Sequence, residues 1–113
     1  MKKALALLII MLFPVDHLCI GQTQEAPKSR VIILTDVENE PDDTESLVRL
    51  LLYSNVLDIE GIIATTSVHM KREVHPESVD RVIQAFGMVQ DNLSKHEPGF
   101  PEADSLLQIV KQG

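Results

Sequence analysis

The chain has 113 residues, and its 10 lysine and arginine residues against 17 aspartate and glutamate residues give a formal net charge of −7. This negative charge, with no basic patch, argues against a nucleic-acid scaffold. Apolar residues make up 44% of the chain and charged residues 24%, a composition typical of a globular chain and not of a disordered or coiled-coil one. At this length we expect one domain at most.

The N-terminus carries the pattern of a secretory signal. Lys2 and Lys3 precede a ten-residue apolar run, Ala4 to Phe13. This pattern predicts a signal peptide over residues 1–21 that is cleaved after Gly21. The run is too short for a membrane span, which needs about 20 apolar residues. We therefore expect a secreted or periplasmic protein with no membrane association after cleavage.

Cys19 is the only cysteine and lies inside this predicted signal peptide. A lipoprotein anchor at Cys19 is the alternative to simple cleavage, but Leu18 stands where the lipoprotein signal takes a small residue. After cleavage the mature chain would contain no cysteine, which excludes a disulfide framework.

Two short apolar runs predict strands. After a polar leader over residues 22–29, the run Val31 to Leu34 is rich in β-branched residues and is typical of a strand buried on both faces. A second run of the same type extends from Ile59 to Thr66. Buried parallel strands of this kind need neighbouring strands and covering helices.

Helical patterns follow the predicted strands. Apolar residues at helical spacing predict a helix that begins after Asp42 as its N-cap, with Glu45 completing a capping box, and ends at about Asn55. Pro76 is well placed in the first turn of a second helix. After a turn, the segment Ala103 to Lys111 is predicted to be a short final helix, with no third strand after it.

The predicted order of strand, helix, strand, helix, helix indicates parallel strands joined by a right-handed crossover. We predict an α/β fold in which residues 30–113 form the N-terminal portion of an open, mostly parallel sheet with helices on both faces. Because two parallel strands do not make a stable sheet alone, we expect the chain to be an incomplete and inactive piece of a larger domain.

The loop after the first strand holds an unusual cluster of carboxylates with no basic residue: Asp36, Glu38, Glu40, Asp42, Asp43 and Glu45. Ligands of open α/β sheets bind at the carboxyl ends of the strands, where this loop lies. Two carboxylates about 5 Å apart repel by roughly 3 kcal/mol at an effective dielectric near 20, and a helix N-terminus returns only about 0.3 to 1 kcal/mol per anion. A bound cation would offset the repulsion, and calcium suits a flexible all-oxygen loop better than magnesium.

Two other interpretations of this acidic loop remain open, and a third is excluded. It can be a solvated helix start, with Asp42 as the cap and the other carboxylates in water. An EF-hand is excluded, because Pro41 stands at the position of its glycine and Leu47 at the position of its final glutamate. A magnesium-dependent phosphotransferase of the haloacid-dehalogenase kind has a second aspartate two residues after the first, where this chain has Glu38.

The stretch RVIILTDVENEPDD, Arg30 to Asp43, resembles the opening of the nucleoside hydrolases, which have DxDPGxDD after a buried strand. The likeness extends through SLVRLLLYSNVLDIEGIIATTS, Ser46 to Ser67, and on to KHEPGFPEAD, Lys95 to Asp104. It is strongest to the secreted nucleoside-hydrolase-like domain of cellulose-binding proteins. The resemblance implies that family's α/β fold and a calcium-dependent cleavage of N-glycosidic bonds.

The resemblance also implies roles for individual residues. Asp36 matches the aspartate that binds calcium and deprotonates the attacking water, and Asp43 matches a second calcium ligand. Asp42 matches the residue that hydrogen-bonds the ribose hydroxyls. Glu40 and His69 are further candidates for substrate binding, His69 because it follows the second strand at the same edge as Asp36.

The sequence therefore predicts a secreted, calcium-dependent hydrolase of N-glycosyl bonds that acts on a nucleoside or related small glycoside. The alternative is a non-catalytic carbohydrate-binding domain on the same fold, with a polysaccharide such as cellulose as its ligand. Aromatic residues make up only 4% of the chain, which gives little support to a flat, stacking cellulose-binding surface.

Overall fold

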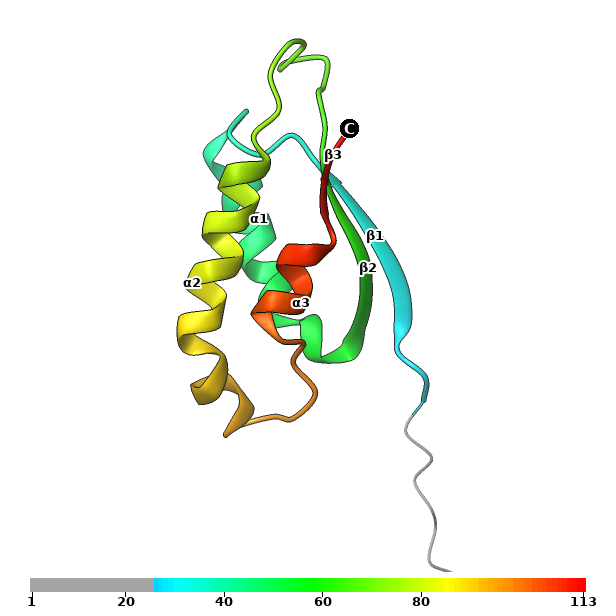
Figure 1. The fold of residues 1–113 in the computed structure, drawn as a ribbon, viewed down its shortest axis with the longest axis vertical. Coiled ribbons are helices and arrows are strands. Elements are labelled where there is room, and N and C mark those ends of the chain that lie inside the picture. The colour runs from blue at the N-terminus through cyan, green and yellow to red at the C-terminus, as the bar shows by residue number, and fades with distance from the viewer. Residues whose placement is uncertain (1–25) are drawn as a thin grey trace, which may run out of the picture.

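The structure is a computed structural model that describes residues 26–113, so the predicted signal peptide and Cys19 lie outside the described residues. The three strands form one sheet, and the three α-helices lie beside it (Figure 1). The elements in chain order are β1 (Ser29–Thr35), α1 (Pro41–Leu52), the 3-10 helix η1 (Ser54–Val56), β2 (Leu57–Ala64), α2 (Pro76–Ser94), α3 (Ala103–Gln108) and β3 (Val110–Gln112).

The sheet has the strand order β1-β2-β3, and both strand pairs are parallel. This arrangement confirms the predicted α/β fold. Both connections advance in the same direction across the sheet, and right-handed crossovers then place their helices on the same face. Figure 1 shows α1, α2 and α3 on one side of the sheet. Within the described residues, the predicted cover on both faces is therefore found on one face only.

The C-terminal segment contains a third strand that the sequence did not predict. The final helix was expected to reach Lys111, but α3 ends at Gln108 and β3 pairs with the second half of β2. The Ile62 N–H donates a hydrogen bond to the Ile109 carbonyl oxygen at 3.2 Å, just before β3 begins. Pairing with a strand that is distant in sequence outweighs the local helical pattern here.

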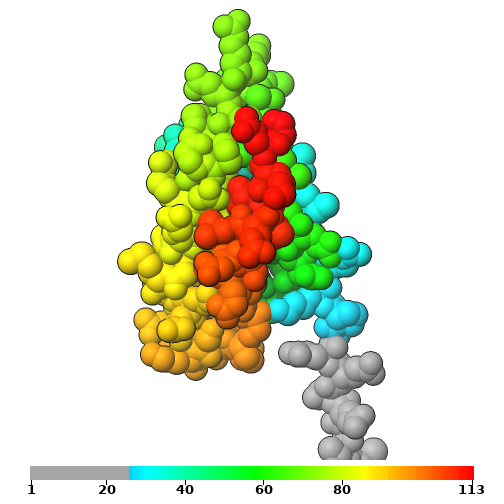
Figure 2. All heavy atoms as spheres, viewed as in Figure 1, coloured from blue at the N-terminus to red at the C-terminus, as the bar shows by residue number. Residues whose placement is uncertain are grey.

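The core lies between the helices and the inner face of the sheet. Ile62 of β2 and Ile83 of α2 are 0% exposed, and Leu51 of α1 and Leu106 of α3 are nearly as buried. Figure 2 shows α2 and α3 packed side by side, with the loop between β2 and α2 projecting beyond the rest at one end. Among the described residues, no helix has both the length and the apolar character needed to cross a membrane.

The outer face of β1 is open. The side chains of Val31 and Ile33 are partly buried on the helix side, whereas Ile32 is 63% exposed and Leu34 is 67% exposed. The prediction that this strand is buried on both faces is therefore wrong for the described residues, because no helix crosses the outer face.

Candidate functional site

The carboxyl end of β1 borders a hollow of about 330 Å³ that lies between β1 and α1. Asp36 follows β1 directly, and Asp43 lies in the first turn of α1; both side chains are half-buried and both line this hollow. Ser46 adds a hydroxyl group, and the remaining lining residues are mostly apolar. The structure thus places the two predicted metal ligands at one site.

Asp43 also stabilises the start of α1. The N-cap is Glu40, whose backbone N–H donates to Asp43 Oδ2 at 2.9 Å. In return the Asp43 N–H donates to the Glu40 carbonyl oxygen at 3.2 Å. The prediction of Asp42 as the cap is wrong by two residues, because Pro41 occupies the first helical position, where its missing N–H costs nothing.

The other predicted site residues lie elsewhere. Glu40 and Asp42 are exposed and do not line the hollow, and the same is true of Glu45. His69 is exposed on the loop after β2, where it borders a separate hollow with the residues that follow it. Two carboxylates about 5 Å apart in water repel by under about 1 kcal/mol, so exposed groups of this kind do not require a cation.

The fit of the site to calcium is partial. Carboxylate oxygens are the donors that calcium prefers, and Asp36 and Asp43 supply them. However, calcium takes about six to eight oxygen ligands. Within residues 26–113 no group of three or more histidine, cysteine, aspartate or glutamate side chains comes together as a metal site. The described residues therefore provide part of a ligand set.

The turn after Asp36 is tied to α2 by a contact that sequence reasoning missed. The Asn39 N–H donates to the Asp36 carbonyl oxygen at 3.0 Å, and Glu38 between them has φ 78°. The Glu38 carboxylate accepts hydrogen bonds from Ser78 Oγ and from Arg81 Nη2, the latter at 2.6 Å. These partners lie about 40 residues further along the chain, so no local pattern could have indicated them.

His75 places a titratable group next to this contact. It is the N-cap residue of α2, and its Nδ1 lies 3.0 Å from Glu77 Oε1 while its Nε2 lies 3.7 Å from Glu73 Oε2. The hydrogen bond to Glu77 raises the pKa of His75, and the negative charges of Glu77, Glu38 and Glu73 add to this effect. The backbone hydrogen bond of Glu77, followed by its bond to His75, lowers the pKa of the Glu77 carboxyl.

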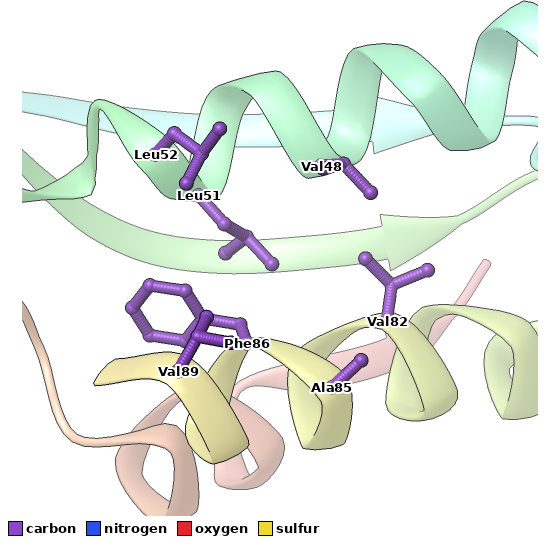
Figure 3. Close-up of a pocket in the computed structure, with 7 residues that line it drawn as sticks. All are labelled: Val48, Leu51, Leu52, Val82, Ala85, Phe86 and Val89. Atoms are coloured by element: carbon purple, nitrogen blue, oxygen red, sulfur yellow. The ribbon is translucent and has the colours of Figure 1, made fainter. Parts of the chain in front are cut away.

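A second hollow, of about 140 Å³, lies between α1 and α2 and is shown in Figure 3. Its lining is apolar and includes Val48 and Leu51 of α1 and Val82 and Phe86 of α2. A sugar needs polar groups to orient it, and none of the lining side chains offers one. We therefore place the candidate site at the carboxyl end of β1 and not between the helices.

Residues 30–113 match the family described as the nucleoside hydrolase-like domain of cellulose-binding Sde182. This chain belongs to that family. This match confirms the resemblance drawn from RVIILTDVENEPDD. The matched residues include nearly all of β1, the acidic loop and all later elements. No curated protein matches the chain.

A solved structure is similar to this Sde182-family chain. It is described as a nucleoside hydrolase-related hypothetical protein from Saccharophagus degradans that is associated with carbohydrate metabolism. The two are 42% identical, the TM-score is 0.73, and the match covers 77% of this chain. It covers 21% of the other protein, so this chain spans about a fifth of that relative's length.

Proposed function

We propose that the domain to which this chain contributes binds a sugar-containing ligand in the hollow lined by Asp36 and Asp43. One observation carries the proposal: two half-buried aspartates line one hollow at the carboxyl end of β1, where open α/β sheets bind their ligands. Carboxylate oxygens accept strong hydrogen bonds from hydroxyl groups. The family description and the description of the solved relative, which name cellulose binding and carbohydrate metabolism, support a saccharide or glycoside as the ligand class.

The finer proposal is hydrolysis of the N-glycosidic bond of a nucleoside or similar glycoside. The position of Asp36 at the strand end, facing the hollow, favours it. In this reaction the Asp36 carboxylate takes a proton from water, and the water oxygen bonds to the anomeric carbon. The C–N bond breaks, and its electron pair leaves with the nitrogen of the nucleobase. Calcium, if bound to Asp36 and Asp43, would supply positive charge that makes this water more acidic.

The rival proposal is saccharide binding without turnover. It is favoured by the partial ligand set, because no third acidic or histidine side chain of the described residues joins Asp36 and Asp43 as a metal ligand. The phosphotransferase alternative gains no support, because Glu38, the residue at its second acidic position, is bound to Ser78 and Arg81 of α2.

One experiment separates hydrolysis from binding alone. The full-length protein is incubated with nucleosides, and separately with soluble cello-oligosaccharides, in calcium and in chelator. Release of free base that stops in chelator supports hydrolysis, and Asp36→Asn should then lower the rate by at least about a hundredfold. Oligosaccharide binding without product supports the rival, and in that case Asp36→Asn should weaken affinity instead.

Glu45→Gln is the matched control for Asp36→Asn. Glu45 belongs to the same acidic cluster but is exposed and does not line the hollow. Its substitution removes the same charge and should leave both rate and affinity near the wild-type values. Equal losses in the two variants would contradict a site at the hollow and would indicate a general effect of negative charge.

We also propose that the chain is exported and cleaved after Gly21. The support is the sequence pattern of Lys2, Lys3 and the apolar run Ala4 to Phe13. Mass spectrometry of the exported protein should show a mature N-terminus at Gln22. Retention of Met1 on cytoplasmic protein would contradict export, and a lipid on Cys19 would indicate the lipoprotein alternative.

A further inference from the structure

We propose that Glu38 is a positioning residue: its carboxylate, held by Ser78 and Arg81 of α2, fixes the turn that presents Asp36 to the hollow. The effect on Asp36 and Asp43 as ligands rests on the proposed function, whereas the effect on the turn does not. Three features of the structure support this inference, namely the backbone of the turn, the contacts of the Glu38 side chain and the burial of Val37.

The backbone at Glu38 has a conformation that glutamate does not favour. The turn is closed by the Asn39 N–H, which donates to the Asp36 carbonyl oxygen at 3.0 Å. Glu38 is the third residue of this turn and has φ 78°, and it is the only described residue other than glycine with positive φ. Glycine or asparagine normally fills such a position, because a Cβ is disfavoured there. A glutamate at this place needs contacts that hold it.

The side chain of Glu38 supplies those contacts. Ser78, in the first turn of α2, is only 4% exposed, and its hydroxyl donates to Glu38 Oε1. Arg81 Nη2 donates to Glu38 Oε1 at 2.6 Å and to Ser78 Oγ at 2.7 Å. The three side chains thus form a closed hydrogen-bonded set in which each bond is assisted by the charge of Glu38, of Arg81 or of both. This set joins the loop after β1 to the start of α2.

The buried side chain of Val37 also anchors this turn. It is 1% exposed and belongs to the hydrophobic core, while Thr35 just before the turn accepts the Thr65 N–H at 2.8 Å across the sheet. With the apolar side chain of Val37 in the core and the carboxylate of Glu38 on α2, the turn has little freedom to rotate. The adjacent Asp36 is therefore held at the hollow that it lines together with Asp43 before any ligand arrives, which lowers the entropic cost of binding.

The competing explanation is that residue 38 matters only through its backbone conformation. The two explanations make opposite predictions for Glu38→Gly, because glycine suits a positive φ but removes the contact to α2. Glu38→Gln is the conservative variant, since its amide oxygen can accept from both Ser78 and Arg81. Arg81→Met tests the contact from the α2 side. The Arg81 side chain is 66% exposed and that of Glu38 is 41% exposed, and neither belongs to the hydrophobic core, so all three variants should fold.

The experiment measures amide hydrogen exchange of the full-length protein by NMR or mass spectrometry. In Glu38→Gly and Arg81→Met, exchange of the Asn39 N–H should be about tenfold faster than in the wild type. Glu38→Gln should keep the wild-type rate, and the Ile62 N–H in β2 should be unchanged in all three. Exchange at Asn39 that is unchanged or slower in Glu38→Gly would overturn the proposal, as would equal loosening in Glu38→Gln.

A calcium titration of the same proteins tests the consequence for the site. Calcium affinity should fall by about tenfold in Glu38→Gly and recover in Glu38→Gln. If the wild type binds no calcium, the calcium proposal fails, while the exchange rates still decide the role of Glu38. If calcium affinity is unaffected although the turn is loosened, Glu38 holds the turn but does not position Asp36, and the proposal is overturned.

Discussion

Ile32 of β1 lies directly opposite Gly61 of β2, and a Cβ on Gly61 would lie 3.6 Å from Ile32 Cγ2. Gly61 is buried although it faces away from the helices, because the Ile32 side chain lies over it. Ile32 itself is 63% exposed, and Leu34 beside it on the same strand face is 67% exposed. The outer face of the sheet therefore presents apolar side chains to solvent.

This open face predicts that the isolated chain associates with itself. Leu34→Lys should lower both self-association and the binding of a hydrophobic dye, because a lysine on an edge strand opposes further pairing and packing. The free energy of unfolding should change by less than about 0.5 kcal/mol, as for other exposed sites. Sedimentation velocity and dye fluorescence measure the two effects. Val68→Lys is the control, because Val68 is 76% exposed on the loop beyond β2; an equal effect there would contradict the prediction.

The cap of α1 predicts different costs for two adjacent aspartates. Asp43→Ala loses the bond to the Glu40 N–H in addition to a charge near the helix start, so it should lower the free energy of unfolding by about 1 kcal/mol more than Asp42→Ala does. Asp42→Ala removes the same charge from the same helical turn but no described hydrogen bond, so it should cost only the dipole contribution of about 0.3 to 1 kcal/mol. Urea unfolding of both variants measures the difference. Equal losses would show that charge near the helix start, and not the cap, is what matters.

The contact between α2 and α3 predicts that Gly87→Ala destabilises the protein although alanine is the better helix former. A Cβ at position 87 would lie 2.9 Å from the Ala103 Cβ, so the helices must move apart. Overpacking of this kind costs about 1 to 3 kcal/mol, against about 1 kcal/mol gained in helix propensity.

Thermal unfolding tests this prediction with two further variants. Ala103→Gly should recover part of the stability lost in Gly87→Ala, because it removes the opposing methyl group. Met88→Ala, at a neighbouring position that is 85% exposed, should have little effect. A rise in Tm for Gly87→Ala alone would show that the helices accommodate the added carbon without cost.

The raised pKa of His75 predicts a pH-dependent contribution to stability. Its folded-state pKa lies above the ordinary value of 6.5, first because of the hydrogen bond to Glu77 and then because of the charges of Glu77, Glu38 and Glu73. The contribution is therefore fully present below pH 6.5 and is lost as the pH rises through the folded-state pKa. Urea midpoints between about pH 5.5 and 8.5 should decline less in His75→Gln than in the wild type. A decline in His75→Gln that equals the wild-type decline would contradict this prediction.

Local features of the sequence were sufficient to predict most elements. The β-branched run around Ile33 and the proline at position 76 mark a strand and a helix start that the structure confirms. The third strand and the face of the sheet that the helices cover could not be predicted from local features. The strand Val110–Gln112 has only three residues and exists because β2 offers a partner, which no local pattern reports. The helices cover only one face because of the strand order β1-β2-β3, which is a property of the whole sheet.

The candidate site also has features that the sequence indicates and features that depend on tertiary packing. Asp36 could be placed because it directly follows a strand, and Asp43 because it opens the next helix. The bond between Glu38 and Arg81 could not be predicted, because it joins residues far apart in sequence and depends on how α2 packs against the loop. Burial also separated Asp43 from its neighbour Asp42, a distinction that residue type alone does not make.

The one-way order of the strands determines where a deep binding crevice can form. In open α/β sheets such a crevice opens where successive crossovers depart to opposite sides, and β1-β2-β3 with all its helices on one side contains no such divergence. A parallel strand added along the free edge of β1, with its helix over Ile32 and Leu34, would create the divergence next to Asp36. The same addition would enclose the carboxylates and bury the exposed isoleucine and leucine, so ligand affinity and solubility should improve together in any longer form that supplies it.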